Sequence, residues 1–527
     1  MSNRVGMPDK RRGVGRNPAC QDREHVADAA SIRKPPQQPH SLTCQGPVHK
    51  HSISVDRIVT AAALADRPTK KSTRSRAAAT WRAAVGWRGV VCAISGWLVL
   101  WGTLSAVAQV PAPPQRQPIA LVGGTVHTVS GETLDAATVL FDQGKLAAIG
   151  AAVELPPNTQ TIEVAGKHVY PGLFEAHSQL GLTEIASVPA TIDHTETGRN
   201  NANVVANVAV NPDSEVIPVT RSAGVLLALT APQGGLISGQ SSVLQLDGWT
   251  YEDMTLLARA GLHINWPSQD RGRRRRGPPR PDEETGPSPT AQIEELREWF
   301  AQARRYAQLR QAPEAQQPFD LRLEALARAA HGELPLIVRA DQLVDIQAAV
   351  AFGVEQKTRT IILGGYDAPL CADLLKKHNV PVIVSAVYRQ PLRRGDPYDH
   401  AYTLPRRLLD AGIKFCISTT DRSETWNTRT LPLHAGTAVG FGLPSAEALK
   451  AITLYPAEIL GVADRVGSLE VGKDATLIVT NGDPLETRTE VLAAYIQGRP
   501  VDLSNKQLRL YQKYEQKYQQ PGHIPGE

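Results

Sequence analysis

The side chains that could do chemistry stand at the ends of short apolar runs. His177, followed two residues later by Gln179, ends the run VYPGLFEAHSQ, and Asp421 follows the run FCISTT. Arg339 and Asp341 lie two residues apart at the end of PLIVRAD. Neutral imidazoles and carboxylates can hold a metal ion or transfer a proton, and a guanidinium can bind a carboxylate. These residue types predict acid–base or metal-assisted chemistry if the fold brings the run ends together.

A glycine-rich stretch offers a second kind of site. Residues 234–241, GGLISGQS, match the spacing of a phosphate-cradling loop, but Gln240 stands where that loop carries lysine. Without this cation nucleotide binding is not expected. The backbone N–H groups near Gly239 and Gln240 could instead hold an anionic part of a substrate. No G-x-S-x-G motif occurs, so serine hydrolysis of that type has no support.

The elements between residues 171 and 464 alternate between apolar strand-like runs and helical stretches, which is typical of a parallel α/β sheet. Eight strands across this length favour a TIM-type (β/α)8 barrel, whose reacting groups lie at the C-terminal ends of the strands. The expected strands are His168–Ala176, Gly224–Ala231, Ser242–Asp247, Leu262–Trp266, Leu334–Ala340, Thr358–Gly364, Val380–Ala386 and Ile413–Thr419.

Short β runs with alternating apolar and polar residues stand at both ends of residues 109–504. Residues 109–170 hold several, and residues 465–504 hold too few to fold alone, so we expect the two to combine into one small β-sandwich in which the barrel is inserted. Residues 268–289 form a charged Pro/Gly tract, expected to be a disordered insertion. The tail, residues 505–527, is expected to be helical and to dock on the body.

The charge is unevenly divided along the chain. The net charge is +5, but residues 1–108 hold 17 Lys+Arg and 6 Asp+Glu, which leaves 40 against 46 for the remainder. The excess of basic residues belongs to residues 1–108, a basic leader, and does not indicate a nucleic-acid partner. Ordinary apolar (42%) and charged (21%) fractions exclude a disordered chain.

Residues 89–108 form an apolar run that follows arginines and ends in Ala-Val-Ala. This pattern predicts a secretory signal and an exported protein, periplasmic or secreted. An uncleaved membrane anchor is the alternative, and contact with a membrane is expected only in that case. Cys371 and Cys416 are too few for a disulfide framework, and we favour buried free thiols over a single disulfide.

Three motifs resemble those of the amidohydrolase superfamily, in particular its imidazolonepropionase-like and dihydroorotase-like branches. They are PGL-x-x-x-H ending at His177, Tyr455-Pro456-Ala457 on a helix, and GSLEVGKDA beginning at Gly467. The resemblance covers about residues 118–502. It implies hydrolysis of C–N bonds other than peptide bonds, helped by one or two divalent ions at the mouth of the barrel.

The resemblance also implies a ligand set that is depleted in this chain. The superfamily's H-x-H reads His177-Ser178-Gln179 here, and Arg339 stands where a fifth-strand histidine is expected. Arginine is always protonated and cannot ligate a metal. His177 and Asp421 remain, with Gln179 as a further candidate, whereas a catalytic zinc normally takes three protein ligands. A single ion, zinc before others, or no metal at all is expected.

Two functions from different classes remain open. In the first, the protein hydrolyses a small substrate such as a cyclic amide, with Asp421, Asp341 and Arg339 as catalytic residues and Arg339, Gly239 and Gln240 binding the substrate. In the second, it is an inactive amidohydrolase relative that binds a small ligand or a partner. A plain salt bridge between Arg339 and Asp341 is the favoured alternative to their catalytic roles. A homodimer is compatible with the pattern, which does not measure it.

Overall fold

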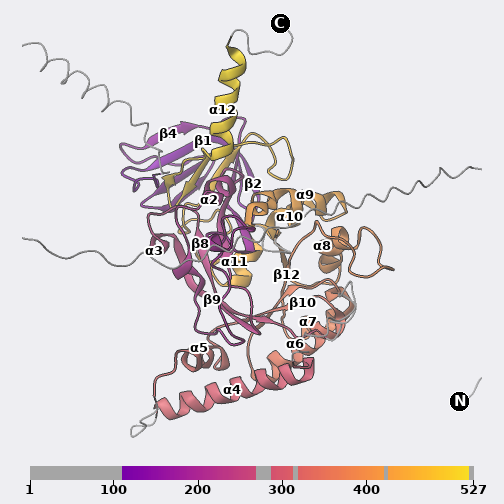
Figure 1. Ribbon diagram of the computed structural model, residues 1–527. Coiled ribbons are helices and arrows are strands. Elements are labelled where there is room, and N and C mark those ends of the chain that lie inside the picture. Colours follow the sequence, from indigo (N-terminus) through magenta and orange to yellow (C-terminus); the bar gives the residue numbers. More distant parts are fainter. Residues whose placement is uncertain (1–109, 269–286, 312–317, 420–424, 521–527) are drawn as a thin grey trace, which may run out of the picture. The chain divides into compact units, whose positions relative to one another are not determined.

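The computed structural model describes residues 110–268, 287–311, 318–419 and 425–520 (Figure 1). All of them lie within one compact unit, Ile94–Glu527. The predicted signal at 89–108, most of the predicted insertion at 268–289 and the candidate Asp421 lie outside the described residues. Within the described ranges no helix has the length and apolar character needed to span a bilayer.

Strands from both ends of the chain form one eight-stranded sheet, in the order β16-β15-β14-β5-β1-β2-β3 with β4 beside β1. The central junction pairs β14 with β5 in antiparallel register, Val479 opposite Val169. Alternate side chains of these strands, such as Leu121, Val139 and Leu477, are fully or almost fully buried in one apolar cluster. The strands are β1 (Ile119–His127), β2 (Thr133–Asp142), β3 (Lys145–Gly150), β4 (Gln160–Glu163), β5 (His168–Pro171), β14 (Leu477–Thr480), β15 (Val491–Ile496) and β16 (Arg499–Pro500).

The second sheet holds eight strands, the number expected for the barrel, in sequence order from β6 to β13. The first expected strand, His168–Ala176, is divided between β5 of the first sheet and β6 of the second. Strands such as β7 and β11 are wholly buried, which explains their continuous apolar runs rather than an alternating pattern, whereas the first half of β9 is partly exposed. The eight strands are β6 (Leu173–Ser178), β7 (Val225–Thr230), β8 (Ile237–Gln245), β9 (Thr255–Asn265), β10 (Leu336–Ala340), β11 (Thr360–Gly364), β12 (Val382–Val384) and β13 (Phe415–Ile417).

One strand corrects the expected (β/α)8 arrangement. β8 runs antiparallel to both β7 and β9, while the other seven strands are parallel. Residues 231–236 join β7 to β8, and a parallel crossover needs a dozen residues or more. Gly234 and Gly235, with φ of +85° and +63°, form this tight turn. The expected strand at Ser242–Asp247 began too late, which hid the hairpin.

Hydrogen bonds join the first and last strands of this sheet and nearly close it. The Ser418 hydroxyl donates to the His177 carbonyl at 3.0 Å. The backbone N–H and hydroxyl of Thr419 both donate to the Glu175 carboxylate, at 3.1 and 2.8 Å. The C-terminal ends of β6 and β13 therefore lie side by side, although 241 to 244 residues separate the bonded groups in sequence.

Helices follow most of the parallel strands and pack their apolar residues against the sheet in the main core, which contains Phe300, Phe352 and Leu408. Asp320 caps α5 by accepting from the N–H groups of Arg322 and Leu323. The helices are α2 (Val216–Arg221), α3 (Tyr251–Met254), α4 (Pro289–Gln311), α5 (Leu321–Ala330), α6 (Leu343–Gln356), α7 (Ala372–Lys377), α8 (His400–Asp410), α9 (Leu431–Gly440), α10 (Ser445–Ala451) and α11 (Leu454–Leu460), with 3-10 turns at Pro189–Thr191, Ala206–Ala209, Ala368–Cys371 and Thr425–Thr430.

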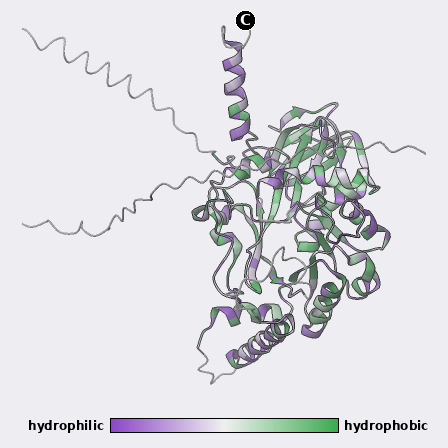
Figure 2. Ribbon diagram, turned by 45° about the vertical axis from the view of Figure 1, so that its right-hand side comes forward, coloured by the Kyte–Doolittle hydropathy of each residue, from purple (hydrophilic) through white to green (hydrophobic). Residues whose placement is uncertain are grey.

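The C-terminal helix α12 (Lys506–Gln519) departs from the expected docking of the tail over most of its length. None of its residues is buried, and Tyr511 is 64% exposed, although Arg509 near its start forms an ion pair with Glu215 at 3.7 Å. Figure 2 colours most of this helix as hydrophilic. Asn505 holds its start, with a side chain that accepts from Leu508 N–H and donates to the Ser222 hydroxyl. Cys371 and Cys416, by contrast, are buried free thiols, as predicted.

Candidate functional site

A cavity of about 400 Å³ lies where the C-terminal ends of β6, β9, β10 and β11 meet the β7–β8 turn. Because reacting groups of barrel enzymes come from this end of the strands, it is the place where the sequence argument puts the chemistry. Its lining is polar and carries one formal cation and, among the described residues, no carboxylate. The lining residues are His177, Pro232, Gln233, Gly234, Ser238, His263, Ile264, Asn265, Arg339 and Leu363.

Two histidines form the inner part of this cavity. His177 on β6 and His263 on β9 are 2% and 5% exposed, and their ring centroids lie 5.7 Å apart. Burial, and then the charge of Arg339, lower the pKa of both imidazoles, that of His263 to about 3. Both rings are therefore neutral at pH 7. The His263 Nε2 atom is buried and has no hydrogen-bond partner within the described residues.

The sequence argument missed His263 as a site residue. The only signal was its place near the C-terminal end of a strand, two residues before Asn265, which gives both side chains the same face. The structure places both in the cavity.

Arg339 and Asp341, predicted as a catalytic pair, face different surroundings. Arg339 lines the cavity beside the two histidines. Asp341 forms an ion pair with Arg389, at 3.1 Å between its Oδ1 atom and the arginine Nη1 atom. Arg389 belongs to the segment that follows β12 and is 6% exposed at its side chain. Asp341 thus forms a salt bridge, but with Arg389, whereas the sequence favoured Arg339 as its partner.

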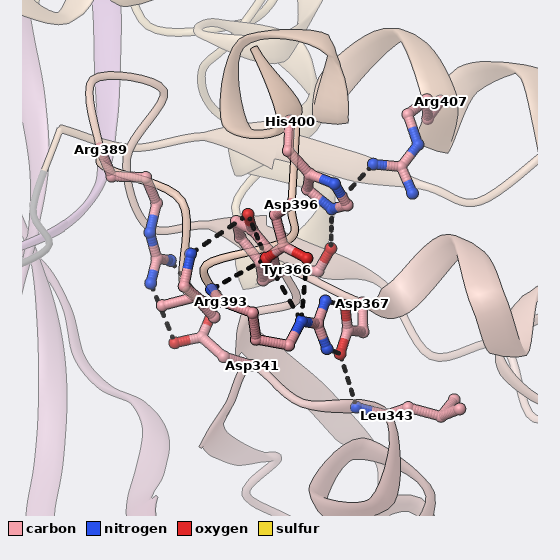
Figure 3. Close-up of polar contacts among 10 residues, drawn as sticks. Asp341, Leu343, Tyr366, Asp367, Arg389, Arg393, Asp396, His400 and Arg407 are labelled. Carbon is pink, nitrogen blue, oxygen red and sulfur yellow. Dashed lines mark hydrogen bonds and ion pairs between the residues drawn. The ribbon is translucent and has the colours of Figure 1, made fainter. Parts of the chain in front are cut away.

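This ion pair belongs to a larger polar network (Figure 3). Asp367, which is fully buried, accepts from both terminal nitrogens of Arg393 at 2.6 and 2.7 Å and from Leu343 N–H at 3.1 Å. Tyr366 donates to Asp396 at 2.9 Å, and its ring stacks on His400 with centroids 4.2 Å apart. Such a satisfied network fixes the segment between β12 and α8 onto the ends of β10 and β11.

Glu175 is a second residue that the sequence argument missed. It lies two residues before His177 on β6, is fully buried, and accepts from the N–H groups of His177 and Thr419 and from the Thr419 hydroxyl. Burial raises its pKa to about 7, although these hydrogen bonds oppose the rise. Its carboxylate bonds to residues on both sides of the seam between β6 and β13 and thereby positions both His177 and Thr419.

The other site residues predicted from the sequence, Gln179, Gly239 and Gln240, do not line the cavity. Gln179 is fully buried, and neither its Oε1 nor its Nε2 atom has a hydrogen-bond partner among the described residues. Gln240 donates through its side chain to Ala202 O at 2.8 Å and through its backbone N–H to Val204 O at 2.8 Å. Gly239 lies opposite His263 in the β8–β9 ladder, with φ of +132°. The N–H of Gln240 is therefore occupied within the fold, and substrate binding by Gly239 or Gln240 stays a prediction.

The side chains of the described residues that could ligate a metal do not form a catalytic metal centre. No group of three His, Cys, Asp or Glu side chains comes together in the described ranges. His177 and His263 have suitable imidazoles, but Arg339 lines the same cavity with a permanent positive charge, which would repel a dication. The Glu175 carboxylate is taken up by Thr419 and His177. Asp421, the remaining predicted ligand, lies outside the described residues.

Comparison with known proteins bears on this arrangement of fold and site. Residues 307–504 match the model of the amidohydrolase family. The chain is 36% identical over 115 residues to the imidazolonepropionase of Syntrophobacter fumaroxidans, a match that covers 22% of this chain and 26% of that protein. It is 29% identical over 125 residues to the N-substituted formamide deformylase of Arthrobacter pascens, covering 20% and 22%. These matches span about a quarter of the length of the relatives.

A solved structure supports the fold over a longer stretch. The amidohydrolase from Thermotoga maritima superposes on 73% of this chain and 99% of its own length, with a TM-score of 0.66 and 24% identity. Over residues 307–504 the chain is similar to the amidohydrolase family, and its fold is similar to that of the Thermotoga maritima amidohydrolase. The relatives that it matches include imidazolonepropionases, as the PGL-x-x-x-H and GSLEVGKDA motifs indicated.

Proposed function

We propose that the protein is a hydrolase that cleaves C–N bonds other than peptide bonds, such as those of cyclic amides, in small substrates bound at the mouth of its barrel. Similarity to the amidohydrolase family supports the reaction class. The observation that carries the assignment to this site is the cavity of about 400 Å³, with two neutral imidazoles and one guanidinium at the C-terminal strand ends.

The residues of the cavity suit particular parts of this reaction. Arg339 can stabilise the negative charge that develops on the carbonyl oxygen when water attacks the amide carbon. The neutral rings of His177 and His263, with the Asn265 amide, can orient the uncharged polar groups of the substrate. Asp421 is the proposed acceptor for the proton of the attacking water. That proton then goes to the nitrogen as the C–N bond breaks.

Turnover on a panel of cyclic amides and N-formyl amines tests this proposal. Product formation would be followed by mass spectrometry, as the addition of one water to a cyclic amide and as the release of the free amine and formate from an N-formyl amine. We expect Arg339→Gln and Asp421→Asn each to lower kcat/KM by about 100-fold or more, the loss typical when a group that stabilises charge in the transition state is removed. Asp341→Asn is the matched control, because Asp341 is paired with Arg389 away from the cavity lining.

The opposite outcome would favour the second function. If no member of the panel is turned over, while isothermal titration shows that a small anion binds to the protein and not to Arg339→Gln, the barrel is a binding module. Loss of anion binding in Arg339→Gln would still show that the cavity is the binding site. Unchanged binding and activity in Arg339→Gln would remove the cavity from the function altogether.

We also propose that the protein is exported by the segment at 89–108. The support is the sequence pattern of this segment, an apolar run that follows arginines and ends in Ala-Val-Ala. N-terminal sequencing of the protein recovered outside the cytoplasm checks it. A mature chain beginning near Gln109 is expected, and a chain that retains residues 89–108 would show an anchor instead.

A further inference from the structure

The cavity combines features that favour a neutral or anionic occupant over a dication. β9 and β10 are parallel neighbours, with His263 opposite Ile337 and Asn265 opposite Arg339. His263 and Arg339 therefore project from adjacent strands, near their C-terminal ends, into one cavity that His177 also lines. Two imidazoles that could hold a metal thus share their space with a guanidinium.

We propose that Arg339 takes the place of a divalent ion in this protein, supplying the positive charge of the site and excluding a metal from the His177–His263 pair. The guanidinium is always charged, so the exclusion holds at every pH at which the protein is folded. Its role in hydrolysis rests on the proposed function; its effect on metal binding does not.

Three carboxylates of the described residues near these strand ends strengthen the inference, because each is committed elsewhere. Glu175 accepts three hydrogen bonds at the seam between β6 and β13. Asp341 is paired with Arg389, and Asp367 with Arg393. None of the three lines the cavity, so none offsets the repulsion between Arg339 and a dication there.

A gain of metal binding tests the inference in the full-length protein. Arg339→His removes the charge and adds a third imidazole, so we expect it to bind Co²⁺ at least about 100-fold more tightly than the wild type, with one ion per chain and the visible absorption of a tetrahedral site. Arg339→Gln removes the charge without adding a ligand and should show a smaller gain. The double variant Arg339→His with His177→Ala should lose the tight binding.

Two results would overturn the inference. One is wild-type protein that holds one equivalent of metal by elemental analysis and loses it in His177→Ala. The other is Co²⁺ affinity that is no higher in Arg339→Gln than in the wild type, a measurement that does not depend on how well Arg339→His folds. Neither readout needs a substrate, so a protein inactive on the amide panel that still gains metal in these variants would contradict the proposed function alone.

Discussion

The two sides of the barrel mouth treat their polar groups in opposite ways. On the cavity side, formed by His177, His263 and Arg339, the buried His263 Nε2 atom has no hydrogen-bond partner among the described residues. On the network side, formed by residues 341, 366–367 and 389–400, the Asp367 carboxylate accepts three hydrogen bonds. Both sides are built on the ends of neighbouring strands.

This difference distinguishes the side of the mouth that can act on a substrate from the side that holds the backbone in place. A buried polar atom without a partner is costly in a finished protein and is rare unless a ligand or water completes it. A satisfied network offers a ligand little and instead rigidifies the backbone around it. The cavity side is therefore the part of the mouth that can act on a substrate, and the network side holds the segment between β12 and α8 in place beside it.

The largest expected effect concerns pH and the cavity side. The pKa of His263 is about 3 in the folded protein and close to 6.5 when unfolded, so the native state binds fewer protons between these values. Stability should therefore fall as pH drops from 6.5 towards 3, by up to roughly 5 kcal/mol for this residue. Urea unfolding across this range checks it: His263→Gln should have a flatter pH profile than the wild type, and parallel profiles would contradict the burial of a neutral ring.

A somewhat smaller loss is expected from breaking the network side. Asp367→Ala removes two charge-assisted hydrogen bonds with Arg393 and leaves Leu343 N–H without its acceptor, so the free energy of unfolding should fall by about 3 kcal/mol. Arg406→Ala is the matched control. Its i,i+4 pair with Asp410 is exposed and should contribute less than about 0.5 kcal/mol. Equal losses in the two variants would show that the network is no more than surface pairing.

The smallest effect sharpens the boundary between the two sides. Asp341→Asn weakens the ion pair with Arg389, and we expect a loss of about 1 to 2 kcal/mol in stability. Because Asp341 does not line the cavity, kcat/KM should change by less than about tenfold, in contrast to Arg339→Gln. A loss of activity as large as that of Arg339→Gln would return Asp341 to the catalytic role first considered for it.

Much of the barrel could be predicted because burial leaves a direct trace in sequence. Strands such as β7 and β11 are apolar at almost every position, which a doubly covered strand requires. The direction of β8 leaves no such trace, because the same residues pair in either sense. Only the short Pro232–Gly235 turn marks the hairpin, and its two glycines were considered as the start of a phosphate loop at residues 234–241.

The candidate site was harder to predict, since it depends on partners distant in sequence. Arg339 and Asp341 have the spacing of a pair, yet Asp341 meets an arginine 48 residues further along the chain. Glu175 gains its role only when Thr419, 244 residues away, closes the sheet. The pKa of an imidazole such as His263 depends on burial and on a neighbouring strand, and neither can be read from one run of residues.

The join between the two ends of the chain has a consequence for when the protein can acquire its structure. β5 pairs with β14, and β6 is bonded to the residues just after β13, so neither sheet can be completed until almost the whole chain has left the ribosome. Contacts of such long sequence separation slow folding. The chain is therefore expected to stay largely unfolded until the strands at its C-terminal end have been synthesised.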